Sequence, residues 1–111
     1  MHITIRSSGL KLNEAERELI RRQLAFALDG LCGQSPRVSV YLADANGTKG
    51  GVDKTCRVVI HRKRQSSLVI EDADHELGAL IHRVADRAGH AAGRQLERMR
   101  TRKSNTSMSG E

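Results

Sequence analysis

The stretch Val38-Ser39-Val40-Tyr41-Leu42-Ala43 places Val38, Val40 and Leu42 on one side of an extended chain. This two-residue period is typical of a β-strand with one face buried and the other in water. Residues 55–61 repeat the pattern, with Cys56, Val58 and Ile60 on one face. The turn-rich residues 44–51 between the two runs predict a hairpin. Because each strand buries a single face, the sheet needs a layer of helices on that face.

The residues before the hairpin predict one strand and one helix. Residues 2–6 alternate in the same way and form the strand. A helix begins after Asn13, because Asn13 and Glu16 stand at capping-box spacing, in which each side chain accepts a backbone hydrogen bond from the other residue. Apolar residues then recur at helical spacing, at Ile20, Leu24, Ala27, Leu28 and Leu31. Gly30 or Gly33 ends this helix.

The residues after the hairpin predict a short strand and a longer helix. Residues 68–70 form the strand, and Asp72 or Asp74 caps the helix, which reaches about Arg100. Its buried face is marked by Leu77, Ile81, Val84, Ala88, Ala91 and Ala92. The order β-α-β-β-β-α predicts an α+β fold, a four-stranded sheet with two helices packed on one face.

Length and composition limit the possible classes of protein. The 111 residues allow one domain, at residues 1–100, followed by a Ser/Thr-rich flexible C-terminal tail at 101–111. The net charge of +6 favours a polyanionic partner, and the aromatic content of 2% disfavours a platform on which bases stack. No apolar run reaches the roughly 20 residues that span a bilayer. We therefore expect a cytoplasmic protein with reduced thiols and no membrane partner.

A row of basic side chains on the second helix is the most informative functional feature. At about 100° per residue, its members lie within roughly 80° of one another. They are Arg83, Arg87, His90, Arg94 and Arg98. Guanidinium groups in a row suit a phosphate backbone, because each planar fork can hold a phosphate through two hydrogen bonds. The alternative is a solvated helix face whose late cations stabilise the helix dipole.

Further basic residues extend this candidate interface. A helix of the predicted length is longer than the strands beside it, so its C-terminal end should project beyond the sheet. The residues expected to assist in binding RNA are Arg62, Lys63, Arg64, Arg100 and Arg102.

No pattern in the sequence predicts catalysis, and we do not expect an enzyme. His75, His82 and His90 share one side of the helix but stand about 10–12 Å apart, too far for one metal ion. Cys56 lies at an inward strand position, typical of a core thiol. The acidic residues Glu71, Asp72, Asp74 and Glu76 are explained by the positive end of a helix. No cofactor, metal or small-molecule substrate is expected.

Three segments resemble the ribosome hibernation promoting factor family, which includes the ribosome-associated inhibitor and the sigma-factor modulation proteins. They are residues 58–61 (VVIH), 68–71 (LVIE) and 76–87 (ELGALIHRVADR). The positions that match the family pattern in the helix are Glu76, Leu77, Ala79, Ile81, Asp86 and Arg87. Gly78 and His82 stand where the family usually has Tyr and Asp. The resemblance covers residues 1 to about 100 and implies a domain similar in outline to double-stranded RNA-binding domains.

The resemblance also implies a function. Such a protein occupies the messenger and transfer RNA channel of the small ribosomal subunit, with basic helix residues on ribosomal RNA. It silences translation in non-growing cells, as part of the stress response of stationary phase. This chain resembles the short class of the family, expected to be a monomer off the ribosome. The alternative function is a regulatory protein-binding module that acts on an acidic protein partner.

Overall fold

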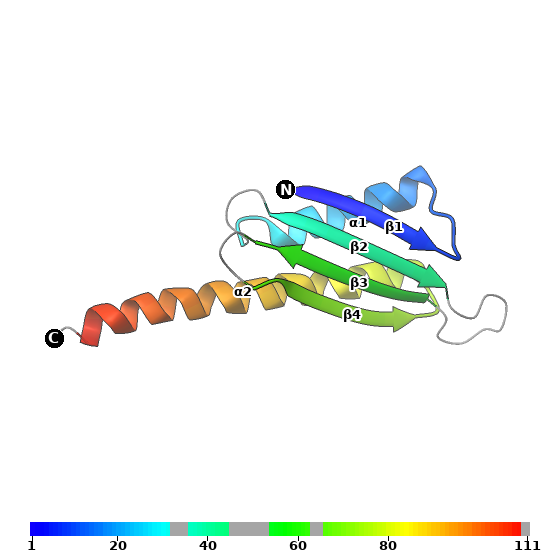
Figure 1. Ribbon diagram of the computed structural model, residues 1–111. Coiled ribbons are helices and arrows are strands. Elements are labelled where there is room, and N and C mark those ends of the chain that lie inside the picture. Colours follow the sequence, from blue (N-terminus) through cyan, green and yellow to red (C-terminus); the bar gives the residue numbers. More distant parts are fainter. Residues whose placement is uncertain (32–35, 45–53, 63–65, 110–111) are drawn as a thin grey trace.

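The chain forms the predicted sequence of strands and helices (Figure 1). The computed structural model describes residues 1–31, 36–44, 54–62 and 66–109, with side chains described as far as Arg98. The elements are β1 (His2–Ser8), α1 (Glu14–Leu28), β2 (Arg37–Asp44), β3 (Lys54–His61), β4 (Leu68–Asp74) and α2 (Leu77–Ser109). The predicted α+β order is confirmed.

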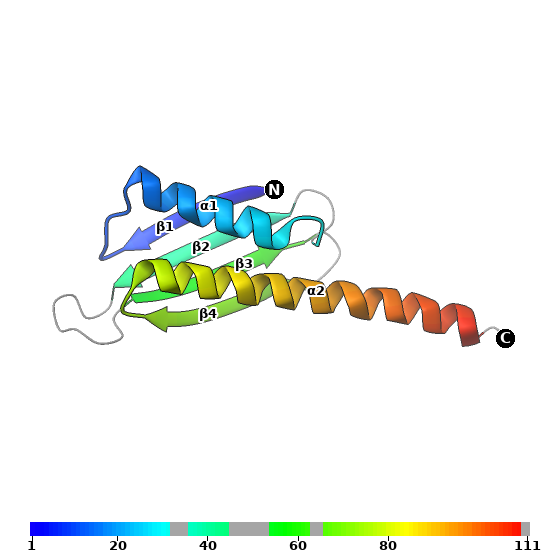
Figure 2. The same ribbon diagram turned by 180° about the vertical axis from the view of Figure 1, so that it is seen from behind.

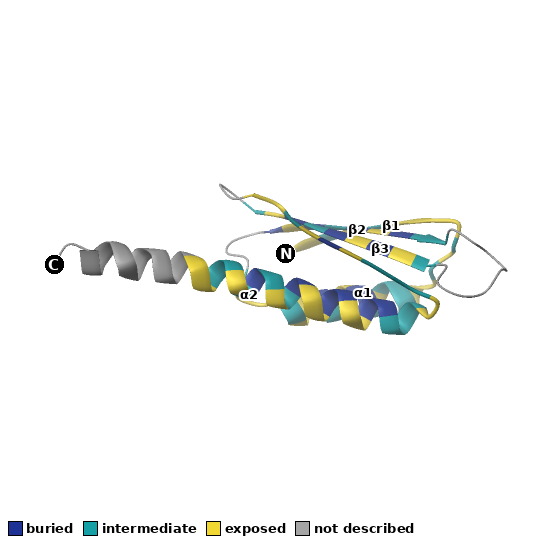
Figure 3. Ribbon diagram, turned by 90° about the horizontal axis from the view of Figure 1, so that it is seen from below, coloured by how far each residue is buried: buried dark blue, intermediate teal, exposed yellow. Residues whose placement is uncertain are grey.

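The four strands form one mixed sheet in the order β1-β2-β3-β4. β1 pairs with β2 in parallel, so the chain must cross over between them, and α1 makes that crossover. β2, β3 and β4 are antiparallel neighbours. Both helices cover the same face of the sheet and leave the other face open (Figures 2 and 3). The predicted two-layer arrangement is confirmed.

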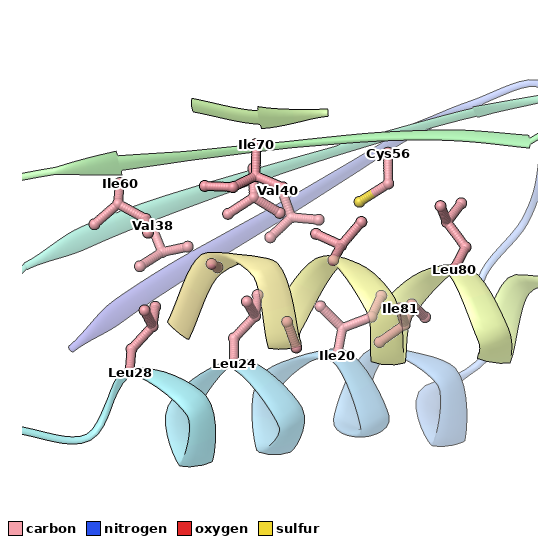
Figure 4. Packing of buried hydrophobic residues seen from close by; sticks show 14 of the residues in the cluster. Ile20, Leu24, Leu28, Val38, Val40, Cys56, Ile60, Ile70, Leu80 and Ile81 are labelled. Carbon is pink, nitrogen blue, oxygen red and sulfur yellow. The ribbon is translucent and has the colours of Figure 1, made fainter. Parts of the chain in front are cut away.

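The core lies between the inner face of the sheet and the two helices (Figure 4). The side chains predicted to point inward from β2 and β3 are at most 3% exposed. Each such Val, Leu or Ile contributes roughly 1.5–3 kcal/mol when it leaves water. The predicted buried face of α2 omitted two core residues, Leu80, which is fully buried, and Ala85. α2 buries a wider face than predicted because it packs against α1 as well as against the sheet.

α1 begins as predicted and ends at the first of the two predicted glycines, Gly30, so Leu31 lies beyond the helix. The Asn13 N–H donates to Glu16 Oε1 at 3.0 Å, and the Glu16 N–H donates to Asn13 Oδ1 at 2.7 Å, which completes the capping box. The helix stops at Leu28, and the next turn places Gly30 at a φ of 72°. Residues with a side chain rarely adopt that left-handed conformation, so Gly30 is the glycine that permits the turn.

The predicted start of α2 was wrong. β4 continues to Asp74, so Asp72 and Asp74 both lie in a strand, although Asp74 Oδ1 accepts from the Glu76 N–H at 3.1 Å just before α2. α2 begins at Leu77, with the Leu80 N–H donating to the Glu76 carbonyl at 3.0 Å. Residues 71–74 pair with β3, and this ladder extends the strand further than its apolar residues suggest.

The predicted end of α2 was also too early. The helix runs past Arg100 to Ser109 and projects beyond the end of the sheet, which makes the molecule 63 Å long and 25 Å by 19 Å across (Figure 1). The backbone hydrogen bonds of a helix run within the helix itself, so its conformation does not have to end where the sheet ends. The division into a domain at 1–100 and a flexible tail at 101–111 stays a prediction.

Candidate nucleic-acid interface

The predicted basic row lies along one exposed flank of α2, beside the β4 edge of the sheet. All of its members are exposed: Arg83, Arg87, His90, Arg94 and Arg98. Three of them line a shallow groove against residues 68–70 of β4, namely Arg87, His90 and Arg94. The helix and the edge strand therefore present one continuous surface.

The first two members of the row are held by the carboxylate of Asp72. Arg83 Nε donates to Asp72 Oδ2 at 2.8 Å, and Arg87 Nη1 donates to the same oxygen at 3.0 Å. Arg83 Nη2 also lies 3.0 Å from Asp74 Oδ2. Backbone carbonyls of β4 accept further hydrogen bonds from both guanidinium groups. We call Arg83 and Arg87 the tied pair.

The carboxylates beside the tied pair are ionised at neutral pH. The hydrogen bond from Arg83, with help from the Ala73 N–H and Arg87, lowers the pKa of Asp72 to about 2. The Glu76 N–H, followed by Arg83, lowers the pKa of Asp74. Two negative charges therefore lie against two positive ones, which weakens the attraction of the tied pair for an external anion.

The positive charge of the outer part of the row is less neutralised by nearby carboxylates. We call His90, Arg94 and Arg98 the outer row. Within the described residues, the Arg94 and Arg98 side chains make neither an ion pair nor a hydrogen bond. His90 Nδ1 lies 3.9 Å from Asp86 Oδ2, and both of these side chains are more than 70% exposed. The outer row spans roughly 12 Å of helix, at about 1.5 Å per residue.

The assisting basic residues are not brought together by the described structure. Arg62 is half-buried and donates from Nη2 to the Ser66 carbonyl, so part of its donor set is already occupied. Its Nε is buried without a partner in the described part of the chain. Lys63 and Arg64 lie outside the described residues, as do the side chains of Arg100 and Arg102. Their contribution to the interface stays a prediction.

The side chains considered for catalysis or metal binding form no second site in the described part of the chain. Cys56 is 3% exposed, and its burial raises the pKa of its thiol to about 12, so the predicted core thiol is confirmed. Within the described ranges, no group of at least three His, Cys, Asp or Glu side chains is placed to hold a metal ion. The same residues contain no helix long and apolar enough to cross a membrane.

Asp72 is the residue at this interface whose role the sequence alone did not indicate. It was assigned to a helix cap because it precedes an apolar helical pattern. Its partners Arg83 and Arg87 follow it by 11 and 15 residues. The contact exists because α2 folds back along β4, which local spacing does not reveal.

Removing the Asp72 carboxylate should destabilise the protein. We expect Asp72→Ala to lower the free energy of unfolding by about 1–2 kcal/mol at pH 7, as measured by urea denaturation. Since the pKa of Asp72 is lower in the folded state, its contribution is present above about pH 4 and is lost as the pH falls towards 2. The difference between wild type and variant should shrink over that range.

Asp86→Ala is the matched control for this prediction. The Asp86 side chain is 72% exposed, and among the described residues its one ion-pair contact is with His90 at 3.9 Å. A change within about 0.5 kcal/mol is expected for such a surface residue. Equal stabilities for the two variants at pH 7 would show that the Asp72 cluster contributes nothing to the fold.

Together the fold and the site define a small α+β domain with exposed guanidinium groups on a projecting helix. No model of a known protein family matches the sequence, and no curated protein matches it either. Solved structures do match. The N-terminal domain of Protein Y from Thermus thermophilus has a TM-score of 0.68 and 22% identity, over 85% of this chain and 98% of that domain. A ribosomal subunit interface protein from Coxiella burnetii has a TM-score of 0.65 and 14% identity, over 91% and 99% of the two chains.

These likenesses establish the fold of the chain. Both structures are members of the hibernation promoting factor family, so the fold implied by the sequence resemblance is confirmed. At 22% and 14% identity, the function of the chain is a separate inference.

Proposed function

We propose that the chain is a ribosome-binding translation inhibitor of the hibernation type. It occupies the messenger and transfer RNA channel of the small ribosomal subunit in the cytoplasm of non-growing cells, and it acts by binding, without catalysis. The observation that carries this proposal is the outer row, exposed on a projecting helix of a fold that a ribosomal subunit interface protein shares.

RNA is the ligand that the outer row suits best. Folded RNA is recognised largely through its shape and its backbone, so few aromatic side chains are needed. The guanidinium groups of Arg94 and Arg98 are available for phosphate oxygens, and His90 adds an N–H donor. The tied pair contributes less, because Asp72 and Asp74 already occupy part of its donors.

One observation favours the alternative, a regulatory module that binds a protein. The Phe26 side chain is 85% exposed, and it lines a groove between α1 and α2 together with Leu31 and Ala85. A large exposed aromatic residue is typical of protein interfaces. Capture of a partner by the tagged chain distinguishes the two functions, because nuclease treatment removes an RNA-dependent partner and spares a protein one.

The direct test is sedimentation of the tagged full chain with ribosomes from stationary-phase cells. We expect it to travel with the small subunit at 50 mM salt. If about four phosphates are contacted, the affinity should fall roughly a hundredfold between 50 and 200 mM salt. The chain should also lower the yield of a translation reaction and compete with transfer RNA for the small subunit. Protein that stays at the top of the gradient at 50 mM salt would contradict the proposal.

A further inference from the structure

The open face of the sheet carries a second group of basic side chains, remote from the helix row. Strand pairing places residues that point away from the helices in rows across the sheet. His2, Arg37 and His61 form one row, and Arg6, Tyr41 and Arg57 form another. We call these six residues the sheet-face array. Thr4 and Ser39 are paired between the two rows.

The charge of this array is uncompensated on its own strands. The outward positions of β1, β2 and β3 include three arginines and no carboxylate. In the described part of the chain, Arg6, Arg37 and Arg57 make no side-chain ion pair. Glu71 on β4 stands opposite Arg57 in register, and it is the nearest outward acid across the sheet. Like charges on one open face repel, so an anionic ligand would stabilise this arrangement.

Most of the array surrounds a hollow in the open face, and Arg57 is the member that lies outside the lining of that hollow. A depression in the open face is lined by five members of the array, with Thr4 and Ser39 between them. The two rows stand about 13 Å apart along the strands, at about 3.3 Å per residue. That separation exceeds the size of one phosphate group, so the cations are spaced for several phosphates in a chain.

Tyr41 adds a feature that a simple anion site does not need. Its side chain lies between Arg6 and Arg57 in the row and is 44% exposed. An exposed aromatic ring beside arginines can stack an unpaired base while the arginines hold the adjoining phosphates. The hydroxyl groups of Thr4 and Ser39 can hydrogen-bond a ribose 2′-OH.

We propose that the sheet-face array binds a single strand of RNA, with its phosphates on Arg6, Arg37 and Arg57 and one base on Tyr41. This surface lies on the opposite side of the sheet from the helix layer, so it is separate from the outer row of α2. The proposal does not depend on ribosome binding, because the array is tested with RNA alone.

The test measures the affinity of the full chain for a fluorescently labelled 12-nucleotide oligouridine by anisotropy at 50 mM salt. We expect Arg37→Ala combined with Arg57→Ala to weaken binding at least tenfold. Tyr41→Ala should weaken it at least about fivefold, and Tyr41→Phe should restore it, because the ring does the stacking. Circular dichroism confirms that each variant is folded.

Arg21→Ala combined with Arg22→Ala is the matched control, since it removes the same charge from exposed positions on α1. We call the Arg37→Ala, Arg57→Ala double variant the sheet variant. If the control loses as much affinity for oligouridine as the sheet variant does, binding is general electrostatic attraction and the proposal is overturned. Competition identifies the ligand. If uridine monophosphate or polyglutamate displaces the probe as well as unlabelled oligouridine does, at equal charge concentration, the array is a site for small anions or acidic proteins and the proposal fails.

Failure here is distinguishable from failure of the proposed function. If only the further inference is wrong, the unsubstituted chain sediments with ribosomes, and the sheet variant binds oligouridine as tightly as the unsubstituted chain does. Loss of oligouridine binding with retained sedimentation in the sheet variant supports two separate RNA-binding surfaces.

Discussion

Reversing the charge of Arg94 and Arg98 together, as Arg94→Glu with Arg98→Glu, should abolish sedimentation with ribosomes. Each guanidinium group makes charge-assisted hydrogen bonds to phosphate, which are worth roughly 1.5–3 kcal/mol apiece. Losing both contacts therefore weakens binding at least about a hundredfold, and the new carboxylates repel the backbone as well. Gradient sedimentation at 50 mM salt measures the loss.

The fold should survive this change, so the loss of binding can be interpreted. Both side chains are exposed and have no partner in the described structure, and surface substitutions of this kind usually alter stability by less than about 0.5 kcal/mol. Arg21→Glu with Arg22→Glu is the control with the same change in net charge, placed on α1. Equal losses in the two double variants would assign binding to net charge, and no loss in either would remove the outer row from the interface.

Gly89→Ala and Gly93→Ala should change stability in opposite directions, although both replace a glycine of α2 by the best helix former. A Cβ atom at Gly89 would lie 2.9 Å from the backbone oxygen of Ala27 in α1. That oxygen cannot move without its helix, so we expect a loss of about 1–2 kcal/mol despite the gain in helix propensity. A Cβ atom at Gly93 meets nothing within 4 Å, so a gain of about 0.5–1 kcal/mol is expected.

Thermal unfolding measures this difference. A gap of about 2 kcal/mol between the variants corresponds to roughly 10 °C in Tm for a domain of this size. If Gly89→Ala unfolds at or above the temperature of Gly93→Ala, the two helices are not in the close contact that the structure shows. Gly89 and Gly93 are the same residue type four positions apart, and only the structure identifies Gly89 as the point of contact with α1.

Much of the fold could be predicted because its signals are local. The two-residue period of β2 and β3 assigns Val58 to the core and Arg57 to the open face. The side chain of Asn13 needs only a partner three residues away to begin α1. Such patterns act within one strand or one helical turn, and the surrounding fold reinforced them.

The signals that failed depend on contacts between distant residues. Asp is a residue type favoured at the N-cap of a helix. Asp72 nevertheless lies in a strand, because it pairs with β3 and accepts hydrogen bonds from Arg83. Ala85 was missed because the width of the buried face of α2 depends on where α1 lies. The sheet-face array was also missed, since Arg6, Arg37 and Arg57 come from three strands and meet only through their register.

The sequence by itself determined the order of the elements, the one-sided sheet and the exposed basic flank of α2. Hydrophobic period and capping act over a few residues, and these features need nothing more. Only the tertiary structure decided which of those basic residues are available. α2 runs back along β4, so Asp72 and Asp74 neutralise the first two cations of the row, whereas Arg94 and Arg98 have no partner among the described residues. The sequence sets how many basic side chains the helix carries, and the carboxylates that the fold places beside them decide which can bind an external anion.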